Sequence, residues 1–281
     1  MEDNRTMIST LSRDKNNIQS ILSSLRSLEK MVESPENNLH KIKNEIKKIE
    51  TKLATNNLLE SINEEISVIK QNYKEQIPEW EDKTRKMFRD ELEGVLSAAG
   101  FELRGDYTRL MVSVFTIELD LENLKGIIWY GNKQESVISC RLNLEDVASK
   151  LTKAHEKIFQ RDYDSGTFFA NLYKAWEIAC AMSTSRDKTR VPISDVLKEY
   201  VYLIQPRKFY LNPSKANFTG YERAFFSYDI HRLEDRVIEG KELNLITATR
   251  SYTKRKTDFL WIPSDLMGNG DYISHISFKE V

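Results

Sequence analysis

Four basic residues lie within seven positions near the C-terminus, in the stretch TRSYTKRKTDFLWIP. They are Arg250, Lys254, Arg255 and Lys256. Guanidinium and ammonium groups gathered on one loop can pair with phosphate oxygens without reading a base sequence. From Thr184 to Ile262 the chain carries 15 Lys and Arg against 10 Asp and Glu, although its formal net charge is −1. The cluster therefore indicates either a contact with a DNA backbone or the solvated bend of a hairpin.

A second group of residues suited to chemistry is acidic. Glu118, Asp120 and Glu122 follow one another at intervals of two, so a strand would place all three carboxylates on one face, where they could bind a divalent cation. The apolar residues between them are also what a half-exposed strand requires. No lysine follows at the spacing of a metal-nuclease motif. We therefore assign no metal site and no catalytic residue here.

Other signals of catalysis or of a cofactor are missing from the sequence. There is no GxxxxGK[ST] phosphate loop and no HExxH motif, and the four histidines lie far apart. The two cysteines, Cys140 and Cys180, are too few for a disulfide framework and fit a reducing compartment. These observations predict a protein that is not an enzyme and that holds no cofactor.

The elements that would position such residues begin with a heptad pattern. Apolar residues recur every seven positions from Leu11 to Leu53, and a second series follows three residues later, which is the pattern of a coiled-coil seam. The predicted interface consists of Leu11, Ile18, Ile21, Leu25, Leu28, Val32, Leu39, Ile42, Ile46, Ile49 and Leu53.

Pro35 interrupts this seam. The residue before a proline disfavours helical geometry, so we expect one helix to end near Glu33 and another to begin with Ser34 as its cap. The two helices either fold back as a hairpin, which we favour, or continue along a partner. A two-helix hairpin is marginal alone. The third helix would come from residues 57–77, where a shifted stripe runs from Leu59 to Ile77, or from another molecule.

Beyond Pro78, which we take as a boundary, the pattern predicts an α+β module. Residues 78–142 indicate a helix and an antiparallel meander, residues 143–238 are mainly helical, and residues 239–281 form a C-terminal β-hairpin and strand. Three helices followed by a hairpin resemble a winged-helix unit with the basic cluster at the tip of its wing. The predicted fold is thus a coiled-coil arm over residues 1–77 followed by an α+β domain over residues 78–281.

This organisation favours a non-enzymatic interaction or scaffolding subunit of an intracellular, bacterial multi-protein assembly. Residues 1–77 would bind a second copy or a partner such as a coiled-coil ATPase or nuclease, an architecture that also suits anti-phage defence complexes. One alternative is a DNA-binding protein with a coiled-coil dimerisation arm and a basic wing, and another is a metal-dependent nuclease or other hydrolase. The polar N-terminus and the lack of an apolar run of about 18 residues predict a cytoplasmic protein without membrane contact.

Overall fold

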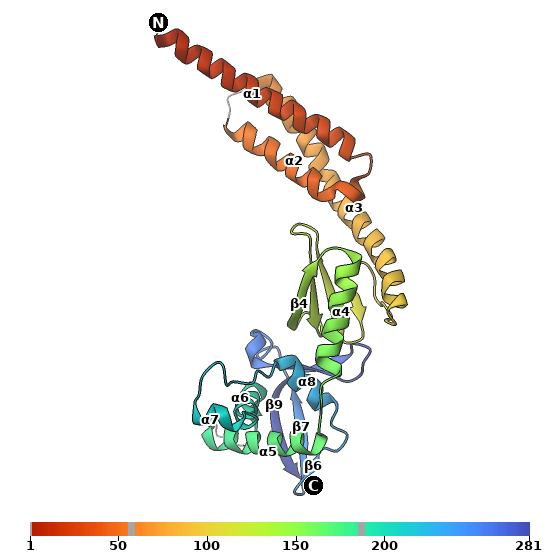
Figure 1. The fold of residues 1–281 in the computed structure, drawn as a ribbon, viewed down its shortest axis with the longest axis vertical. Coiled ribbons are helices and arrows are strands. Elements are labelled where there is room, and N and C mark those ends of the chain that lie inside the picture. The colour runs from red at the N-terminus through yellow and green to blue at the C-terminus, as the bar shows by residue number, and fades with distance from the viewer. Residues whose placement is uncertain (1, 56–59, 185–188) are drawn as a thin grey trace. The chain divides into compact units, whose positions relative to one another are not determined.

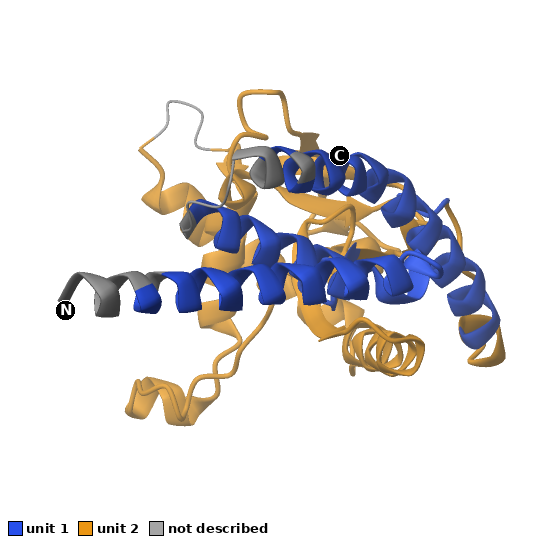
Figure 2. Cartoon of the chain, turned by 90° about the horizontal axis from the view of Figure 1, so that it is seen from above, with its two compact units in different colours: residues 1–95, 106–108, 119–125 blue, residues 96–105, 109–118, 126–281 orange. Residues whose placement is uncertain are grey.

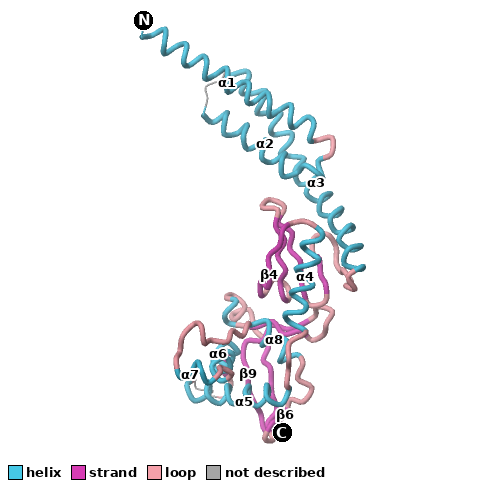
Figure 3. The backbone as a smooth tube through the Cα atoms, viewed as in Figure 1, coloured by secondary structure: helices cyan, strands magenta, loops and turns pink. Residues whose placement is uncertain are grey.

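The computed structural model describes residues 2–55, 60–184 and 189–281 (Figure 1). The chain divides into two compact units (Figure 2). Unit 1 contains the residues up to 95 together with 106–108 and 119–125, and unit 2 contains the remainder. This division lies near residue 95 rather than at the expected position, 77. The helices and antiparallel strands together give the expected α+β class (Figure 3).

Unit 1 is built from three helices. They are α1 (Glu2–Met31), α2 (Pro35–Thr55) and α3 (Glu60–Ala98). The second helix begins at Pro35 as predicted, since a proline at the first helical position loses no intrahelical hydrogen bond. The first helix ends two residues before the expected Glu33.

The first two helices form the antiparallel hairpin that the sequence favoured. Lys52 of α2 lies 3.5 Å from the amide oxygen of Asn17 on α1, and Glu45, seven residues earlier on α2, accepts a hydrogen bond from Ser24, seven residues later on α1. As numbers fall along one helix they rise along the other. The chain direction therefore reverses at the turn before Pro35.

The third helix also runs antiparallel to α2, and ion pairs join the two. Lys43 pairs with Glu81, Lys74 pairs with Glu50, and Lys83 lies 3.3 Å from Glu36. The same chain thus supplies a third helix. Two residues of the predicted third stripe, Leu59 and Ile62, lie outside the described part of the molecule or have no described side chain.

The expected helix boundary at Pro78 is wrong, because α3 continues through this residue. A proline inside a helix removes one backbone hydrogen bond and crowds the preceding turn. Neighbouring ion pairs to α2 at Lys74 and Glu81, on either side of Pro78, hold the helix across this position.

The first sheet has four strands in the order β1-β2-β3-β4, which is the order of the expected meander. Its strands are β1 (Leu110–Val112), β2 (Phe115–Asp120), β3 (Lys125–Tyr130) and β4 (Glu135–Arg141). Helix α4 (Leu144–Phe159) follows and packs on β4. Its cap is Asn143, whose side-chain oxygen accepts a hydrogen bond of 2.8 Å from the backbone of Asp146.

The remaining elements of unit 2 surround a second sheet. The helices are α5 (Ser165–Met182), α6 (Ile193–Leu203), α7 (Arg207–Leu211) and α8 (Arg223–His231). The strands are β5 (Val191–Pro192), β6 (Val237–Ile238), β7 (Lys241–Thr247), β8 (Leu260–Pro263) and β9 (Gly270–Glu280), and Lys256–Asp258 form a short 3₁₀ helix.

The predicted hairpin around the basic cluster is wrong. Strand β7 pairs with β9 in the order β5-β9-β7-β6, and β8 pairs with β9 as well. Ile273 of β9 is opposite both Thr247 of β7 and Leu260 of β8, so these two strands lie on opposite edges of β9. All four residues of β8 are buried, and the free edge of the long central strand offers them a partner. The basic loop therefore crosses from one edge of β9 to the other.

The core of unit 2 lies where this sheet meets its helices. Phe226 of α8 is fully buried, and its ring lies 5.4 Å from that of Tyr200 and 6.1 Å from that of Phe168. Beside it, the hydroxyl of Ser227 donates to the Trp261 carbonyl at 2.5 Å. Because the buried side of α8 satisfies its polar groups within the core, this helix is a structural element of unit 2.

Candidate functional site

The face of α1 that packs inside unit 1 differs from the predicted seam. The buried residues are Asn17, Ile21, Ser24 and Leu28, which repeat at intervals of four, three and four. Only Ile21 and Leu28 belong to the predicted interface. Lys52 and Glu45 of α2 bind the two buried polar side chains, as described above. Helix α1 is therefore rotated so that one of its two predicted apolar rows does not enter the bundle.

The other apolar row of α1 is left at the edge of the bundle or outside it. Leu25 and Val32 are half-buried, whereas the side chains of Leu11 and Ile18 are 59% and 43% exposed. Ile8 and Leu22 lie on the same side of the helix and are also exposed. We call Ile8, Leu11, Ile18 and Leu22 the α1 stripe. Their spacing of three, seven and four residues makes a single apolar row along a helix.

The second helix behaves as the sequence predicts. Leu39, Ile42, Ile46 and Ile49 are all buried, and Leu53 is half-buried. Since α2 contacts α1 on one side and pairs with α3 on another, both of its apolar rows are covered. The five predicted interface residues of α2 thus contribute to the internal bundle, together with Ile21 and Leu28 of α1.

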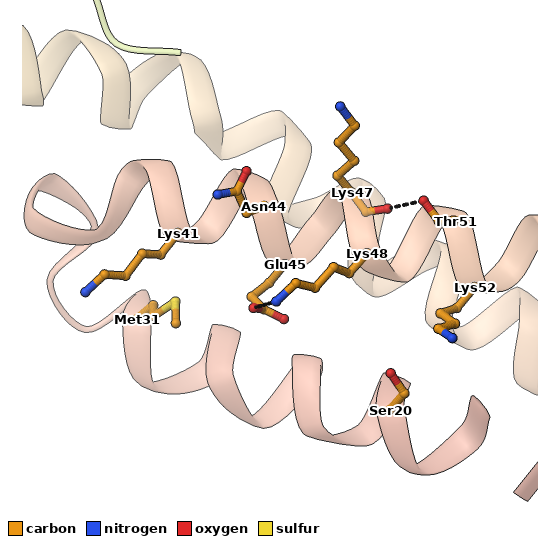
Figure 4. Close-up of a pocket in the computed structure, with 9 residues that line it drawn as sticks. All are labelled: Ser20, Met31, Lys41, Asn44, Glu45, Lys47, Lys48, Thr51 and Lys52. Carbon is orange, nitrogen blue, oxygen red and sulfur yellow. Dashed lines mark hydrogen bonds and ion pairs between the residues drawn. The ribbon is translucent and has the colours of Figure 1, made fainter. Parts of the chain in front are cut away.

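A groove between α1 and α2 is positively charged (Figure 4). Its volume is about 630 Å³, and on its α2 side Lys48 pairs with Glu45, three residues earlier on the same helix, at 2.6 Å. The residues that line it are Ser20, Met31, Lys41, Asn44, Glu45, Lys47, Lys48, Thr51 and Lys52. The four lysines suit an acidic group. Sequence reasoning missed this groove, although lysines at positions 41, 48 and 52 share one helical face.

The structure divides the predicted basic cluster. Arg250, Lys254 and Arg255 are exposed on the loop between β7 and β8. Lys256 instead donates to the carbonyls of residues 133 and 134 at 2.8 and 3.2 Å, and its ammonium lies 4.8 Å from the centre of the Trp129 ring. This lysine fixes the base of the loop, so three of the four predicted residues remain accessible to a ligand.

Arg223, at the start of α8, forms hydrogen bonds with the C-terminal end of the same loop. Its guanidinium donates to the carbonyls of Lys256 and Phe259 at 2.8 and 2.5 Å and pairs with Glu135 at 2.6 Å. The loop therefore leaves the body of unit 2 from a fixed base.

The acidic residues considered for a metal site have structural partners. Glu118 pairs with Lys133 at 2.5 Å and accepts a hydrogen bond of 2.8 Å from the Trp129 indole. Asp120 accepts hydrogen bonds from Asn123, whose side chain and backbone lower the pKa of this carboxyl. Within the described ranges, no three His, Cys, Asp or Glu side chains are grouped so that they could hold a metal ion.

A buried polar network in unit 2 was not predicted. Asp229 of α8 is 3% exposed and pairs with both Arg161, at 2.5 Å, and Arg232. The hydroxyl of Tyr221 donates to the same carboxylate, and burial together with the Asp229 charge raises the pKa of this tyrosine. The guanidinium of Arg161 also lies over the ring of Phe225, at 4.2 Å. This network joins α8 to the segments before it.

The thiol of Cys140 is not suited to act as a nucleophile. Cys140 is buried, which raises the pKa of its thiol, and Cys180 is half-buried. A raised pKa leaves less of the nucleophilic thiolate at neutral pH.

Comparisons with protein-family models, with curated proteins and with solved structures find no match to this chain. Of the helices that the structure describes, none combines the length and the apolar character needed to span a bilayer. Functional inference therefore rests on the α1 stripe, the basic surfaces and the fold that presents them.

Proposed function

We propose that this chain is a non-enzymatic interaction subunit that docks on a partner helix through the α1 stripe. The proposal rests on the burial pattern of α1, in which polar residues are buried and apolar residues are exposed. Polar Asn17 and Ser24 are buried at 8% and 6% exposure, whereas apolar Leu11 and Ile18 face solvent. A helix that had only to stabilise its own bundle would bury the apolar row. The exposed row is therefore available to a second protein surface.

The dimensions of the α1 stripe suit a helical partner. From Ile8 to Leu22 the row extends over 14 residues, which is about 21 Å along a helix. Burying a Leu or Ile side chain contributes roughly 1.5–3 kcal/mol, so four such residues offer a substantial driving force for association. A heptad-spaced row is what a partner helix recognises by knobs-into-holes packing.

The partner is either a second copy of the chain or a helix of another subunit, such as a coiled-coil ATPase or nuclease of the kind named above. Replacing Leu11 and Ile18 together by glutamate places two charges in the row and should abolish association in both cases. Light scattering measures self-association of the full chain, and co-purification from the source cell measures capture of a different protein. Loss of the complex in either measurement supports the proposal.

A second candidate function is contact with the backbone of duplex DNA through Arg250, Lys254 and Arg255. Helices α5, α6 and α8 followed by strands β7, β8 and β9, with the basic loop between β7 and β8, follow the element order of a winged-helix unit, although β7 and β8 do not pair as a wing. Helix α8, however, stands where such a unit has its recognition helix, and it is mostly buried. The basic loop would therefore act alone and without sequence preference.

The double substitution Lys254→Glu and Arg255→Glu tests this candidate. Removing two phosphate contacts should lower the affinity for duplex DNA and reduce the salt dependence of binding by about two counterions. Titration of a labelled duplex at several salt concentrations measures both quantities. Failure of the wild type to bind at low salt, or an unchanged slope in the variant, rules this candidate out.

A further inference from the structure

The segment from Gln205 to Tyr221, which joins α6 to α8 and contains α7, is a closed loop with a fixed shape. The buried side chain of Gln205 ties its two ends together. Its amide nitrogen donates to the carbonyls of Val201 and Thr219 at 2.7 and 3.0 Å, and its amide oxygen accepts from the backbone of Thr219 at 2.8 Å. We call residues 205–221 the aromatic loop. Because the buried Gln205 amide forms hydrogen bonds with backbone groups at both ends of the loop, the loop is a compact surface element.

Aromatic rings of this loop face the solvent. The rings of Phe209 and Phe218 meet edge to face at 5.6 Å, and Tyr210 lies 6.0 Å from Phe209. Tyr210 is 57% exposed and Phe218 is 42% exposed, and Leu211 beside them is 75% exposed. Tyr202 of α6 adds a further exposed ring, and its carbonyl accepts a hydrogen bond from the Tyr210 hydroxyl. The aromatic rings of the loop therefore contact one another but remain accessible to solvent.

The charge of the aromatic loop has one sign. Arg207, Lys208 and Lys215 are exposed, and the sequence from 205 to 221 contains no Asp or Glu. The nearest acidic residues along the chain are Glu199 and Glu222, and both already pair with lysines. The exposed rings therefore lie on a loop whose charged side chains are all positive.

We propose that the aromatic loop binds single-stranded nucleic acid. Unpaired bases expose flat faces that stack on aromatic side chains, and the phosphates between them pair with Arg and Lys. Tyr210 and Phe218 would receive bases, while Arg207, Lys208 and Lys215 would contact the backbone. A duplex hides its base faces, and an acidic peptide offers charge without stacked planes. This binding site is separate from the α1 stripe and from the basic loop before β8.

Fluorescence anisotropy of the full chain with labelled 20-nucleotide oligothymidine and oligouridine tests the proposal. At low salt the wild type should bind at least one of the two. Tyr210→Ala should weaken binding about tenfold, since stacking of one base accounts for a change of this size. Arg207→Glu with Lys208→Glu should weaken it by tenfold or more. The matched control, Lys153→Glu with Lys279→Glu, changes the charge by the same amount at exposed positions outside the aromatic loop and outside the basic loop before β8, and should bind single strands like the wild type.

Several results would overturn the proposal. One is a wild type that binds neither oligonucleotide. Another is an equal loss in the control and in the Arg207 and Lys208 variant, because binding would then reflect diffuse charge. If the Arg207 and Lys208 substitutions weaken duplex binding as much as single-strand binding, or if Tyr210→Ala leaves single-strand binding unchanged, base stacking is not involved.

A competition experiment identifies the alternative ligand. If polyglutamate displaces the labelled oligonucleotide as effectively as unlabelled nucleic acid does, the surface binds an acidic protein. Since both basic side chains are exposed, their variant tests the proposal even if Tyr210→Ala perturbs the loop.

Discussion

At the scale of single residues, Asp229 shows how unit 2 depends on one buried charge. Its carboxylate compensates two guanidinium groups, on Arg161 and Arg232, and accepts a hydrogen bond from Tyr221. Removing one partner of a buried ion pair leaves the other charges uncompensated. We expect Asp229→Asn to lower the free energy of unfolding by about 3 kcal/mol, measured by urea denaturation followed by aromatic fluorescence.

The matched control for this substitution is Asp162→Asn, which removes an exposed carboxylate from the same chain segment as Arg161. A solvent-exposed substitution of this kind should change stability by less than about 0.5 kcal/mol. If Asp229→Asn and Asp162→Asn have equal effects, the buried network does not stabilise unit 2 as described.

Residues whose partners are close in sequence could be predicted, and residues whose partners are distant could not. Asn143 and Asp164 cap α4 and α5, and each accepts a hydrogen bond from a backbone amide three residues on. The ion pair between Arg161 and Asp229 joins positions 68 residues apart. The periodicity of a sequence carries no information about pairs so far apart along the chain. The buried network could therefore be identified only from the structure.

At the scale of elements, Pro78 lies inside α3 at a cost to the helix. It removes one intrahelical hydrogen bond and its ring crowds the turn before it. Pro78→Ala should therefore raise the free energy of unfolding of unit 1, by about 1–3 kcal/mol, in urea unfolding followed by circular dichroism at the helical band.

Glu79→Ala, at the exposed next position of the same helix, provides the control and should change stability only by a few tenths of a kcal/mol. A Pro78→Ala protein that is no more stable than this control would show that the proline is accommodated without cost, through a local distortion of α3.

Element types were more predictable than element partners. An antiparallel meander, α2 from Pro35 and helices within residues 143–238 followed from period and end signals. The partner of β8 did not, because an apolar stretch indicates a strand without indicating which edge it joins. For the same reason, three exposed basic residues lie on a loop that crosses β9 and not at the tip of a hairpin.

At the scale of the whole molecule, the account depends on which row of α1 faces inward. The heptad pattern predicted two apolar rows on α1, but it could not distinguish the row that packs on α2 from the row that stays exposed. The two rows lie side by side on one helix, and their residue types are alike. Buried Asn17 and Ser24, bound to Lys52 and Glu45, decide the orientation. These polar contacts join residues on different helices and have no signal in the pattern.

The most direct measurement is the mass of the full chain in solution by multi-angle light scattering, over a range of concentrations, for two variants. Leu11→Glu with Ile18→Glu changes the α1 stripe. Ser9→Glu with Asn16→Glu adds the same charges at the same spacing on the other exposed flank of α1. Substitutions are preferable to a truncated chain that begins at residue 78, because such a truncation would cut through α3. Where the wild type is a monomer, the same pair of variants is compared by co-purification from the source cell.

We expect the Leu11 and Ile18 variant to lose its self-association, or its co-purifying partner, while the Ser9 and Asn16 variant retains it. Circular dichroism should show equal helix content in both, because neither pair of positions lies in the buried face of α1. Equal behaviour of the two variants and the wild type in both measurements would contradict the central claim that the exposed row of α1 is a docking surface.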